Sequence, residues 1–385
     1  MISQHEWESL YFEGRWPELR KIIAQCIDKL PNDNSFPFRV SREHCAAIGH
    51  IALLGNVWKM KQLGLCNNKP LILLRNFKSP CNLLLNLLRE YYPIQFTKKD
   101  SLEIFGPYIE YLEDKIAIFQ TKTGSLINDF ECNQQAKAEV EWAKTFSGPL
   151  LKLPDSVLEQ GSAKYQALTK SKSENHMVMH LRNNVNDPLR SARNVNINTY
   201  KTVCEYIANK GYNVFFMGDN SLKNIFQGQN FYFLDQDNEE DNWFQIYIIA
   251  RAKLFIGTPS GPAWIPPLFN VKTLATNWWP FCFRRWFPED IMIPKKLKFK
   301  NKILKFSEIN GLKESKIESL GNLQKNGYEL AENTYDEIIS GVEEMEKNNL
   351  STKNTASSQK MFNDLFKDTG FYNCARIALS QEQFV

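Results

Sequence analysis

The chain has 385 residues, of which 43% are hydrophobic and 23% are charged, and its formal net charge is +4. This composition excludes a fibrous or disordered chain, and the small net charge gives no support to a nucleic-acid-binding surface. The apolar runs stop well short of the roughly 20 residues that a membrane-spanning helix needs. Because the N-terminus carries acidic and aromatic residues instead of a basic start and an apolar run, we expect a cytoplasmic protein without a secretory signal.

The first half of the chain predicts a helical appendage followed by an α/β domain. Residues 1–40 carry apolar side chains at helical spacing and form the appendage. In residues 41–165, the strand-like segment PLILLRNF precedes a helical pattern from Asn82 to Tyr92, and a second apolar segment, DKIAIFQ, follows. Strands that alternate with helices are typical of a parallel sheet. We therefore predict a Rossmann-like domain, with its boundary in the polar stretch from Gly161 to Asn175.

The second half predicts another Rossmann-like domain, over residues 166–310. Strand patterns occur in HMVMHL, YNVFFMGD, FYFLD, LFIGT and VKTLATN, with helical patterns between them. We expect the first of these helices to be capped by Asn198 and closed by Gly211. Residues 311–385 are charged and predict a C-terminal helical extension. The expected fold class is α/β, with two Rossmann-like domains facing a cleft and helical extensions at both ends.

Polar residues that follow the predicted strands are the candidate site, because ligands of open α/β sheets bind beyond the carboxyl ends of the strands. His180 and Arg182 follow the first strand of the second half, and Arg190 and Arg193 lie in the same loop. Guanidinium groups match phosphate oxygens two at a time. The loop therefore predicts an anion site; a solvated loop with surface arginines is the alternative.

Two further strand ends carry small or polar residues. Thr258, Ser260 and Gly261 lie between LFIGT and a helix start, where backbone N–H groups can bind phosphate. A tight turn would use the same residues. Gly218 and Asp219 end YNVFFMGD and could contact a nucleoside, or could form a turn with an Asx cap.

His50 is the candidate catalytic group of the first half, because it follows Gly49 at the start of a predicted helix. An imidazole titrates near neutrality and suits acid–base chemistry in a cleft between domains; a core or capping histidine is the alternative. The eight cysteines occur singly, without a CxxC pair or zinc-ligand spacing, so we expect free thiols and no metal site. The sequence GxxxxGK[ST] is absent, which disfavours a kinase or an ATPase.

These segments resemble a family of bacterial GT-B glycosyltransferases associated with surface-polysaccharide synthesis. The resemblance covers most of Cys45 to Met345 and rests chiefly on IGHIALLGNVWKMKQLG, HLRNNVNDPLRSARNVNINTY and ARAKLFIGTPSGPAWIPPLFNVKTLATNW. More remotely, the strand end His180-Leu181-Arg182 is similar to the HxR motif of the fucosyltransferase group, in which an arginine holds the donor's phosphates. The resemblance implies a GT-B-like fold and metal-independent transfer from a nucleotide-sugar to a glycan or lipid-linked acceptor, without a cofactor.

The resemblance also implies roles for individual residues. It implies a donor site in the C-terminal domain, with Arg182 on the diphosphate, and an acceptor near His50. The residues expected at the donor are His180, Arg182, Arg190, Arg193, Asn194, Gly218, Asp219, Thr258, Ser260, Gly261 and Pro262. The arginines would neutralise the leaving diphosphate in place of a metal ion. The residues expected in catalysis are His50, Arg182 and Asp187, and the base is left open among Asp187, His50 and a carboxylate such as Asp129 or Glu131.

Two other functions fit the same two-domain arrangement, namely a nucleotide-sugar epimerase and a non-catalytic sugar-binding protein. A strip of aromatic and basic residues from Trp278 to Phe287, followed by PKKLKFKNK, would suit peripheral contact with the inner face of a membrane or with a lipid-linked acceptor. Packing between domains is the alternative for this strip.

Overall fold

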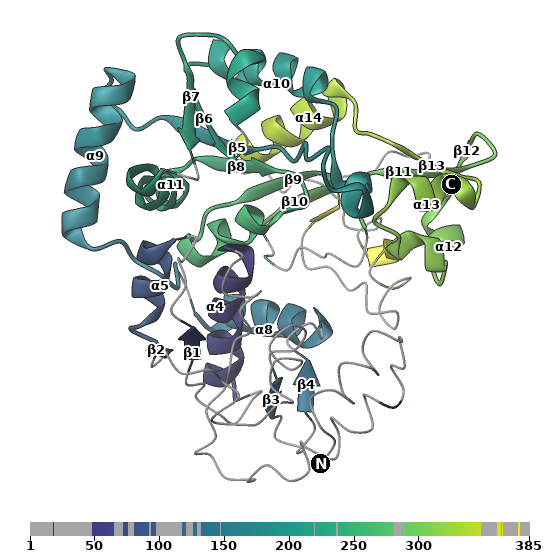
Figure 1. Cartoon of the computed structure of the whole chain (residues 1–385), viewed down its shortest axis with the longest axis horizontal. Coiled ribbons are helices and arrows are strands. Elements are labelled where there is room, and N and C mark those ends of the chain that lie inside the picture. The colour runs from purple at the N-terminus through teal and green to yellow at the C-terminus, as the bar shows by residue number, and fades with distance from the viewer. Residues whose placement is uncertain are drawn as a thin grey trace.

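A computed structural model of the chain describes residues 18, 48–64, 72–75, 81–91, 94–97, 118–120, 126–128, 132–146, 148–218, 220–235, 238–280, 287, 289–347, 360–362, 364 and 376–377. The predicted N-terminal appendage lies almost entirely outside these residues, as do Asp129, Glu131 and positions 281–286 of the aromatic strip. The described part is a mixed α/β structure around a seven-stranded sheet (Figure 1), which confirms the predicted α/β class.

The central sheet is parallel throughout. Its strands, in chain order, are β5 (His176–His180), β6 (Asn213–Gly218), β7 (Phe231–Asp235), β8 (Leu254–Gly257), β9 (Thr273–Trp278), β10 (Ile291–Pro294) and β14 (Arg376–Ile377). In space they lie in the order β14-β10-β9-β8-β5-β6-β7. Counted from β5, the strands before β14 follow the Rossmann order 3-2-1-4-5-6, which places the topological switch point between β5 and β8.

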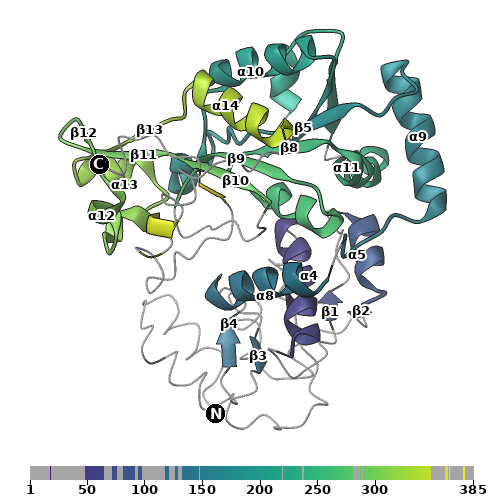
Figure 2. The same cartoon turned by 180° about the vertical axis from the view of Figure 1, so that it is seen from behind.

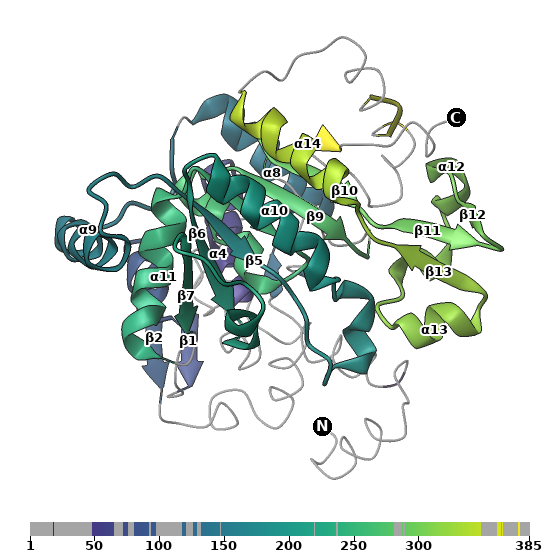
Figure 3. The ribbon, with the colours of Figure 1, turned by 90° about the horizontal axis from the view of Figure 1, so that it is seen from above.

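Strands β5, β6, β8, β9 and β10 are buried on both faces. Successive side chains alternate between two cores, so that Val178 faces one core while Met177 and Met179 face the other. One core includes α10 (Ile197–Asn209) and α14 (Tyr335–Glu346), which lie over the same face of the sheet (Figure 3). The other core includes α11 (Glu239–Arg251). Burial on both faces explains why β5, β6, β8 and β9 could be predicted from the sequence. Strands β10 and β14 were not predicted.

The ends of α10 show how local sequence sets a helix boundary. The predicted cap is wrong by two residues: Asn196 is the N-cap, and its side chain accepts a hydrogen bond of 3.0 Å from the backbone N–H of Asn198. The predicted end is confirmed, because Gly211, with φ +87°, follows the C-cap residue Lys210. A glycine adopts this left-handed conformation without steric cost.

The described part of the first half lies on the α11 side of the sheet, away from α10 and α14 (Figures 1 and 2). Its helices are α4 (Ile48–Gln62), α5 (Asn82–Leu88) and α8 (Cys132–Thr145). Its strands are β1 (Ile72–Arg75), β2 (Ile94–Thr97), β3 (Ile118–Gln120) and β4 (Leu126–Asn128). The pair β1–β2 is parallel, but β2 was not predicted. The predicted segment DKIAIFQ contains β3, which pairs antiparallel with β4.

A buried ion pair joins α4 to α8. The Lys59 ammonium lies 2.8 and 2.9 Å from the two carboxylate oxygens of Glu139, and both side chains are 3% exposed. The Lys59 ammonium also lies 5.9 Å from the ring centre of Trp142. Because both groups are buried, water could not stabilise either charge if the other were removed.

The polar stretch in which we predicted the domain boundary begins within a helix, α9 (Asp155–Thr169). A Cβ atom at Gly161 would lie 2.1 Å from the ring of Tyr247 in α11. The glycine therefore allows α9 to pack closely on α11, beside the sheet (Figure 2).

A small antiparallel sheet extends the structure beyond β10. It contains β11 (Lys296–Phe299), β12 (Lys302–Ile303) and β13 (Tyr328–Ala331), with α12 (Phe306–Ile309) and α13 (Leu320–Lys325) beside them (Figure 1). We call residues 296–331 the appended sheet.

The described part of the aromatic strip is packed inside the protein. Trp278 and Trp279 are buried, and Trp279 donates a hydrogen bond of 2.8 Å to the carbonyl of Ile317. This packing favours the alternative interpretation of the strip for these two residues. None of the helices in the described residues is both long enough and apolar enough to cross a membrane.

Candidate functional site

The candidate site lies at the switch point, where the loops that follow β5 and β8 meet. His180 pairs with Gly257 in the sheet, and the backbone N–H of Thr258 donates to the carbonyl of His180 at 3.1 Å. The buried Thr258 hydroxyl in turn accepts a hydrogen bond of 2.9 Å from the backbone N–H of Arg182. Thr258 thereby fixes the start of the loop from Arg182 to Val195, which we call the arginine loop.

His180 is an uncharged member of the site. Its Nδ1 atom lies 2.8 Å from the Ser260 hydroxyl oxygen, which also lies 3.0 Å from the carbonyl oxygen of Thr258. Burial, chiefly, together with the nearby charges of Arg182 and Arg193, lowers the pKa of His180 to about 4. The imidazole is therefore neutral at physiological pH and adds no positive charge for an anion.

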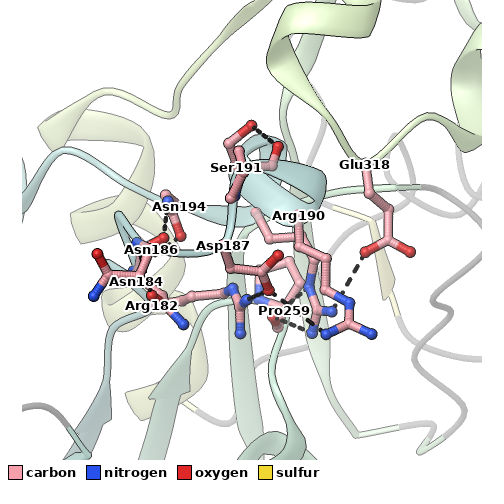
Figure 4. A network of polar contacts seen from close by, with 11 residues as sticks. Arg182, Asn184, Asn186, Asp187, Arg190, Ser191, Asn194, Pro259 and Glu318 are labelled. Atoms are coloured by element: carbon pink, nitrogen blue, oxygen red, sulfur yellow. Dashed lines mark hydrogen bonds and ion pairs between the residues drawn. The ribbon is translucent and has the colours of Figure 1, made fainter.

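Arg182 provides a partly engaged guanidinium at the switch point. Its Nη2 atom donates to Asp187 Oδ2 at 2.8 Å (Figure 4), and its side chain is 18% exposed. The Nε atom of Arg182 is buried and has no hydrogen-bond partner. Arg190 lies 3.5 Å from the same carboxylate oxygen, with its side chain 60% exposed. The structure therefore brings Arg182, Asp187 and Arg190 together in one ion-pair cluster.

Arg193 fastens the arginine loop to two other parts of the chain. Its Nε and Nη2 atoms donate to the carbonyl of Pro259 at 3.0 and 2.8 Å, and its Nη1 atom lies 3.4 Å from Glu318 (Figure 4). The side chain is 14% exposed. Burial lowers the pKa of Arg193 to about 10, and the charge of Arg182 contributes. Arg193 therefore remains charged near neutrality and adds positive potential while it holds the loop in place.

Further contacts to the arginine loop were not anticipated from the sequence. The Asn194 side chain bonds the backbone N–H and carbonyl of Asn184 at 3.1 and 2.9 Å. The Lys295 ammonium, which is 2% exposed, donates to the carbonyl of Asn194 at 2.6 Å. The backbone N–H of Ala192 donates to the carbonyl of Glu318 at 2.8 Å. Glu318 belongs to no motif, and Lys295 lies in the basic segment PKKLKFKNK but is buried in contact with the arginine loop. Only the folded structure identifies these two contacts.

Helix α4 of the first half touches the loop that follows β8. A Cβ atom at Gly49 would lie 2.3 Å from the Cα atom of Gly261, and one at Gly261 would lie 3.1 Å from the Gly49 nitrogen. The absence of a side chain at Gly261 thus serves the packing of α4. Pro262 follows in a short 3-10 helix, Gly261–Trp264. His50 is next to this contact along α4, but its side chain lies outside the described atoms.

We expect the Gly49→Ala variant to be less stable than the wild type, by about 1–3 kcal/mol, because the new methyl group overlaps the Gly261 backbone. Intrinsic helix propensity predicts the opposite sign, a gain of about 1 kcal/mol. Urea unfolding distinguishes the two outcomes, with Gln62→Ala, an exposed change in the same helix, as the control. A more stable Gly49→Ala variant would contradict the close contact.

Gly218 lies beside His180 at the carboxyl end of the neighbouring strand. It has φ +107°, and a Cβ atom there would lie 3.3 Å from His180 Nε2. Glycine is favoured at such a φ, and its lack of a side chain leaves the space next to Nε2 open. Asp219, which follows, lies outside the described residues.

A second buried histidine, His176, predicts how stability depends on pH. Its Nε2 atom lies 2.8 Å from the Ile248 carbonyl, and burial lowers its pKa from 6.5 to about 4. The carbonyl of Ile248 and the charge of Glu174 raise this pKa, whereas the charge of Arg251 lowers it. Because the unfolded chain binds the proton at a higher pH than the folded chain, stability is lost as the pH falls from 6.5 towards 4.

We therefore expect the free energy of unfolding to decrease between pH 6.5 and pH 5 by about 1.5 kcal/mol more in the wild type than in His176→Gln. The glutamine amide can still donate to Ile248, so the change removes titration and keeps the donor. Urea unfolding at both pH values measures the difference, and the carboxylates that titrate in both proteins cancel. Equal decreases in the two proteins would show that His176 does not titrate in this way.

Within the described residues, no group of three or more His, Cys, Asp or Glu side chains could hold a metal ion. Cys81 and Cys204 are buried, and neither forms a disulfide bond.

Comparisons with known proteins give similarity in fold only. No family model matches the chain, and no curated protein matches it in sequence. Among solved structures, the chain is similar to the ADP-heptose LPS heptosyltransferase II of E. coli, at 13% identity and a TM-score of 0.40 over 62% of this chain and 84% of that one. It is also similar to a family 9 glycosyl transferase from Veillonella parvula, at 12% identity and a TM-score of 0.28 over 58% and 60% of the two chains. A third similar structure is the E. coli heptosyltransferase WaaC with ADP, at 10% identity and a TM-score of 0.32 over 62% and 86%. Likeness at this level does not specify an activity, so the function has to be inferred from the residues of the site.

Proposed function

We propose that this chain is a glycosyltransferase that moves a sugar from a nucleotide-sugar donor to a glycan or lipid-linked acceptor, in the synthesis of a surface polysaccharide or glycoconjugate. The observation that carries the proposal is the position of the Arg182 guanidinium. It lies at the switch point of a Rossmann-ordered sheet, where such folds bind their ligands, and among the described residues its Nη2 atom has a hydrogen-bond partner whereas its Nε atom has none.

The chemistry of sugar transfer suits this guanidinium. The bond between the anomeric carbon and the diphosphate oxygen breaks while the acceptor oxygen forms a new bond to the same carbon. Negative charge grows on the leaving nucleoside diphosphate, and a fixed guanidinium in a partly dry site stabilises that charge. Arg182 is 18% exposed and is therefore suited to this role without a metal ion. Arg193 adds positive potential from within the loop.

The roles of the remaining predicted residues follow from their contacts. The carboxylate of Asp187 is engaged by Arg182 and lies close to Arg190, so we assign it the orientation of Arg182. This assignment favours His50 as the base that takes the acceptor proton, because α4 carries it to the contact with Gly261. Arg190 is largely exposed and could approach the donor from the edge of the site.

Acceptor-dependent release of nucleoside diphosphate tests the proposal. Purified protein is incubated with each of a panel of nucleotide-sugars, with and without glycan or lipid-linked acceptor preparations, and the released nucleotide is measured. A glycosyltransferase releases nucleoside diphosphate at a high rate only when an acceptor is present. An epimerase would convert the sugar without release, and a non-catalytic binding protein would leave the nucleotide-sugar intact; either result would overturn the proposal.

A further inference from the structure

The hydrogen bonds around Ser260 fix which nitrogen of His180 carries the proton. A serine hydroxyl has one hydrogen, and here its oxygen has two partners, the Thr258 carbonyl oxygen at 3.0 Å and His180 Nδ1 at 2.8 Å. A carbonyl oxygen can only accept, so Ser260 donates to Thr258. His180 Nδ1 must then carry a hydrogen and donate it to Ser260, which leaves Nε2 with a lone pair.

The lone pair of Nε2 lies in an open position. None of the described residues makes a hydrogen bond to Nε2. A Cβ atom at Gly218 would crowd Nε2 at 3.3 Å, so the glycine keeps a side chain out of this position. The strands β5 and β6 are adjacent, so this position lies at the carboxyl edge of the sheet, next to the switch point. Burial and two nearby guanidinium groups keep the ring neutral, which preserves the lone pair.

We propose that His180 binds the ligand as a hydrogen-bond acceptor, through Nε2, and takes a hydroxyl group of the donor rather than a phosphate oxygen. Phosphate oxygens are themselves acceptors and are repelled by a lone pair, whereas a hydroxyl can donate to it. The site then has two chemically different sides, a guanidinium side at Arg182 for the diphosphate and an imidazole side for a hydroxyl. Ser260 is a positioning residue that selects the tautomer. The inference rests on the proposed function, because it concerns the same ligand.

Two substitutions of His180 distinguish the contributions of its two ring nitrogens to binding. In His180→Asn the side-chain amide can replace Nδ1–H and keep the bond to Ser260, but it removes the acceptor at Nε2. In His180→Gln the longer amide can place an oxygen near the position of Nε2. We expect His180→Asn to weaken binding of a nucleoside diphosphate or its nucleotide-sugar by about three- to tenfold, the value of one neutral hydrogen bond, and His180→Gln to restore part of the loss. Inorganic pyrophosphate, which has no hydroxyl to donate, should bind both variants and the wild type equally.

Calorimetry with pyrophosphate, with ADP, GDP, UDP and CDP, and with their nucleotide-sugars measures these affinities. If His180 contacts the ribose, removing the 2′- or 3′-hydroxyl should weaken binding to the wild type as much as His180→Asn weakens binding of the parent nucleotide. The deoxy nucleotide should then bind His180→Asn and the wild type with the same affinity. If it contacts the transferred sugar, only the nucleotide-sugar should lose affinity. An equal loss for pyrophosphate in His180→Asn, or no loss for any nucleotide, would overturn the inference.

A spectroscopic measurement tests the tautomer without any ligand. In nitrogen-15 spectra of histidine-labelled protein, His180 should show a protonated Nδ1 and an unprotonated Nε2 from pH 5.5 to 8, and Ser260→Ala should convert it to a mixture of tautomers. A wild-type spectrum with the proton on Nε2 would overturn the inference even if His180→Asn failed to fold. Absence of all nucleotide binding would overturn the proposed function and this inference together, whereas nucleotide binding that is indifferent to His180→Asn overturns the inference alone.

Discussion

Replacing Arg182 by alanine is expected to lower the rate constant of sugar transfer by about 10²- to 10³-fold, the usual effect of removing one fixed donor to a developing negative charge. Arg182 lies at the switch point, its Nε atom is buried without a partner, and its Nη2 atom is oriented by Asp187 at 2.8 Å. The charge it stabilises is larger in the transition state than in the bound donor, so kcat should decrease more than donor affinity.

The matched control for this prediction is Arg190→Ala. Arg190 belongs to the same loop and approaches the same carboxylate, but its side chain is 60% exposed, so solvent screens its charge and we expect a decrease of only a few-fold. Arg182→Lys should recover part of the lost rate, because an ammonium supplies the charge without the planar fork. Steady-state rates of nucleotide release in the three variants test these expectations. Unchanged turnover in Arg182→Ala would show that Arg182 does not stabilise the leaving diphosphate.

Replacing Lys59 by methionine is expected to lower the free energy of unfolding by about 3–5 kcal/mol. The reason is the fate of its partner, because the Glu139 carboxylate is 3% exposed and would lose both hydrogen bonds from the ammonium. The long apolar stem of methionine fills much of the space of the lysine, so the loss would come from the unpaired charge rather than from a cavity.

The double variant Lys59→Met, Glu139→Leu separates these causes. With both charges removed, the two helices can pack through apolar side chains, and we expect most of the stability to return. Urea unfolding of the two single variants and the double variant gives the coupling energy directly. Additive losses in the double variant would show that the pair contributes through packing and not through its charges.

Five of the seven strands of the central sheet were predicted from the sequence, most of them because burial on both faces gives apolar runs. Strands β10 and β14 were not predicted. The appended sheet could not be predicted in this way. Its strand β11 contains lysines at alternate positions, Lys296 and Lys298, and is short, so it resembled a basic surface segment. The error at the start of α10 has a local cause, since Asn196 and Asn198 are both good capping residues and only the backbone conformation selects the first.

The position of the candidate site followed from strand ends, but the partners of its residues did not. Sequence pattern indicates that Arg182, Thr258 and Ser260 follow strands of one sheet, and the structure brings the two loops that carry them together. Which guanidinium is available for a ligand depends on Glu318 and on the carbonyl of Pro259, both of which engage Arg193. These contacts join residues as many as 125 positions apart, and no local pattern encodes them.

The long separation between the arginine loop and Glu318 has a consequence for biosynthesis. A ribosome makes the loop first, and the residue that pairs with Arg193 is added 125 positions later; Lys295, which holds Asn194, is added 101 positions later. A nascent chain that already contains every arginine of the loop therefore lacks the contacts that fix them. The proposed donor site therefore lacks its fixing contacts until residue 318 has been synthesised, so a donor could stabilise the folded chain only late in translation or after it.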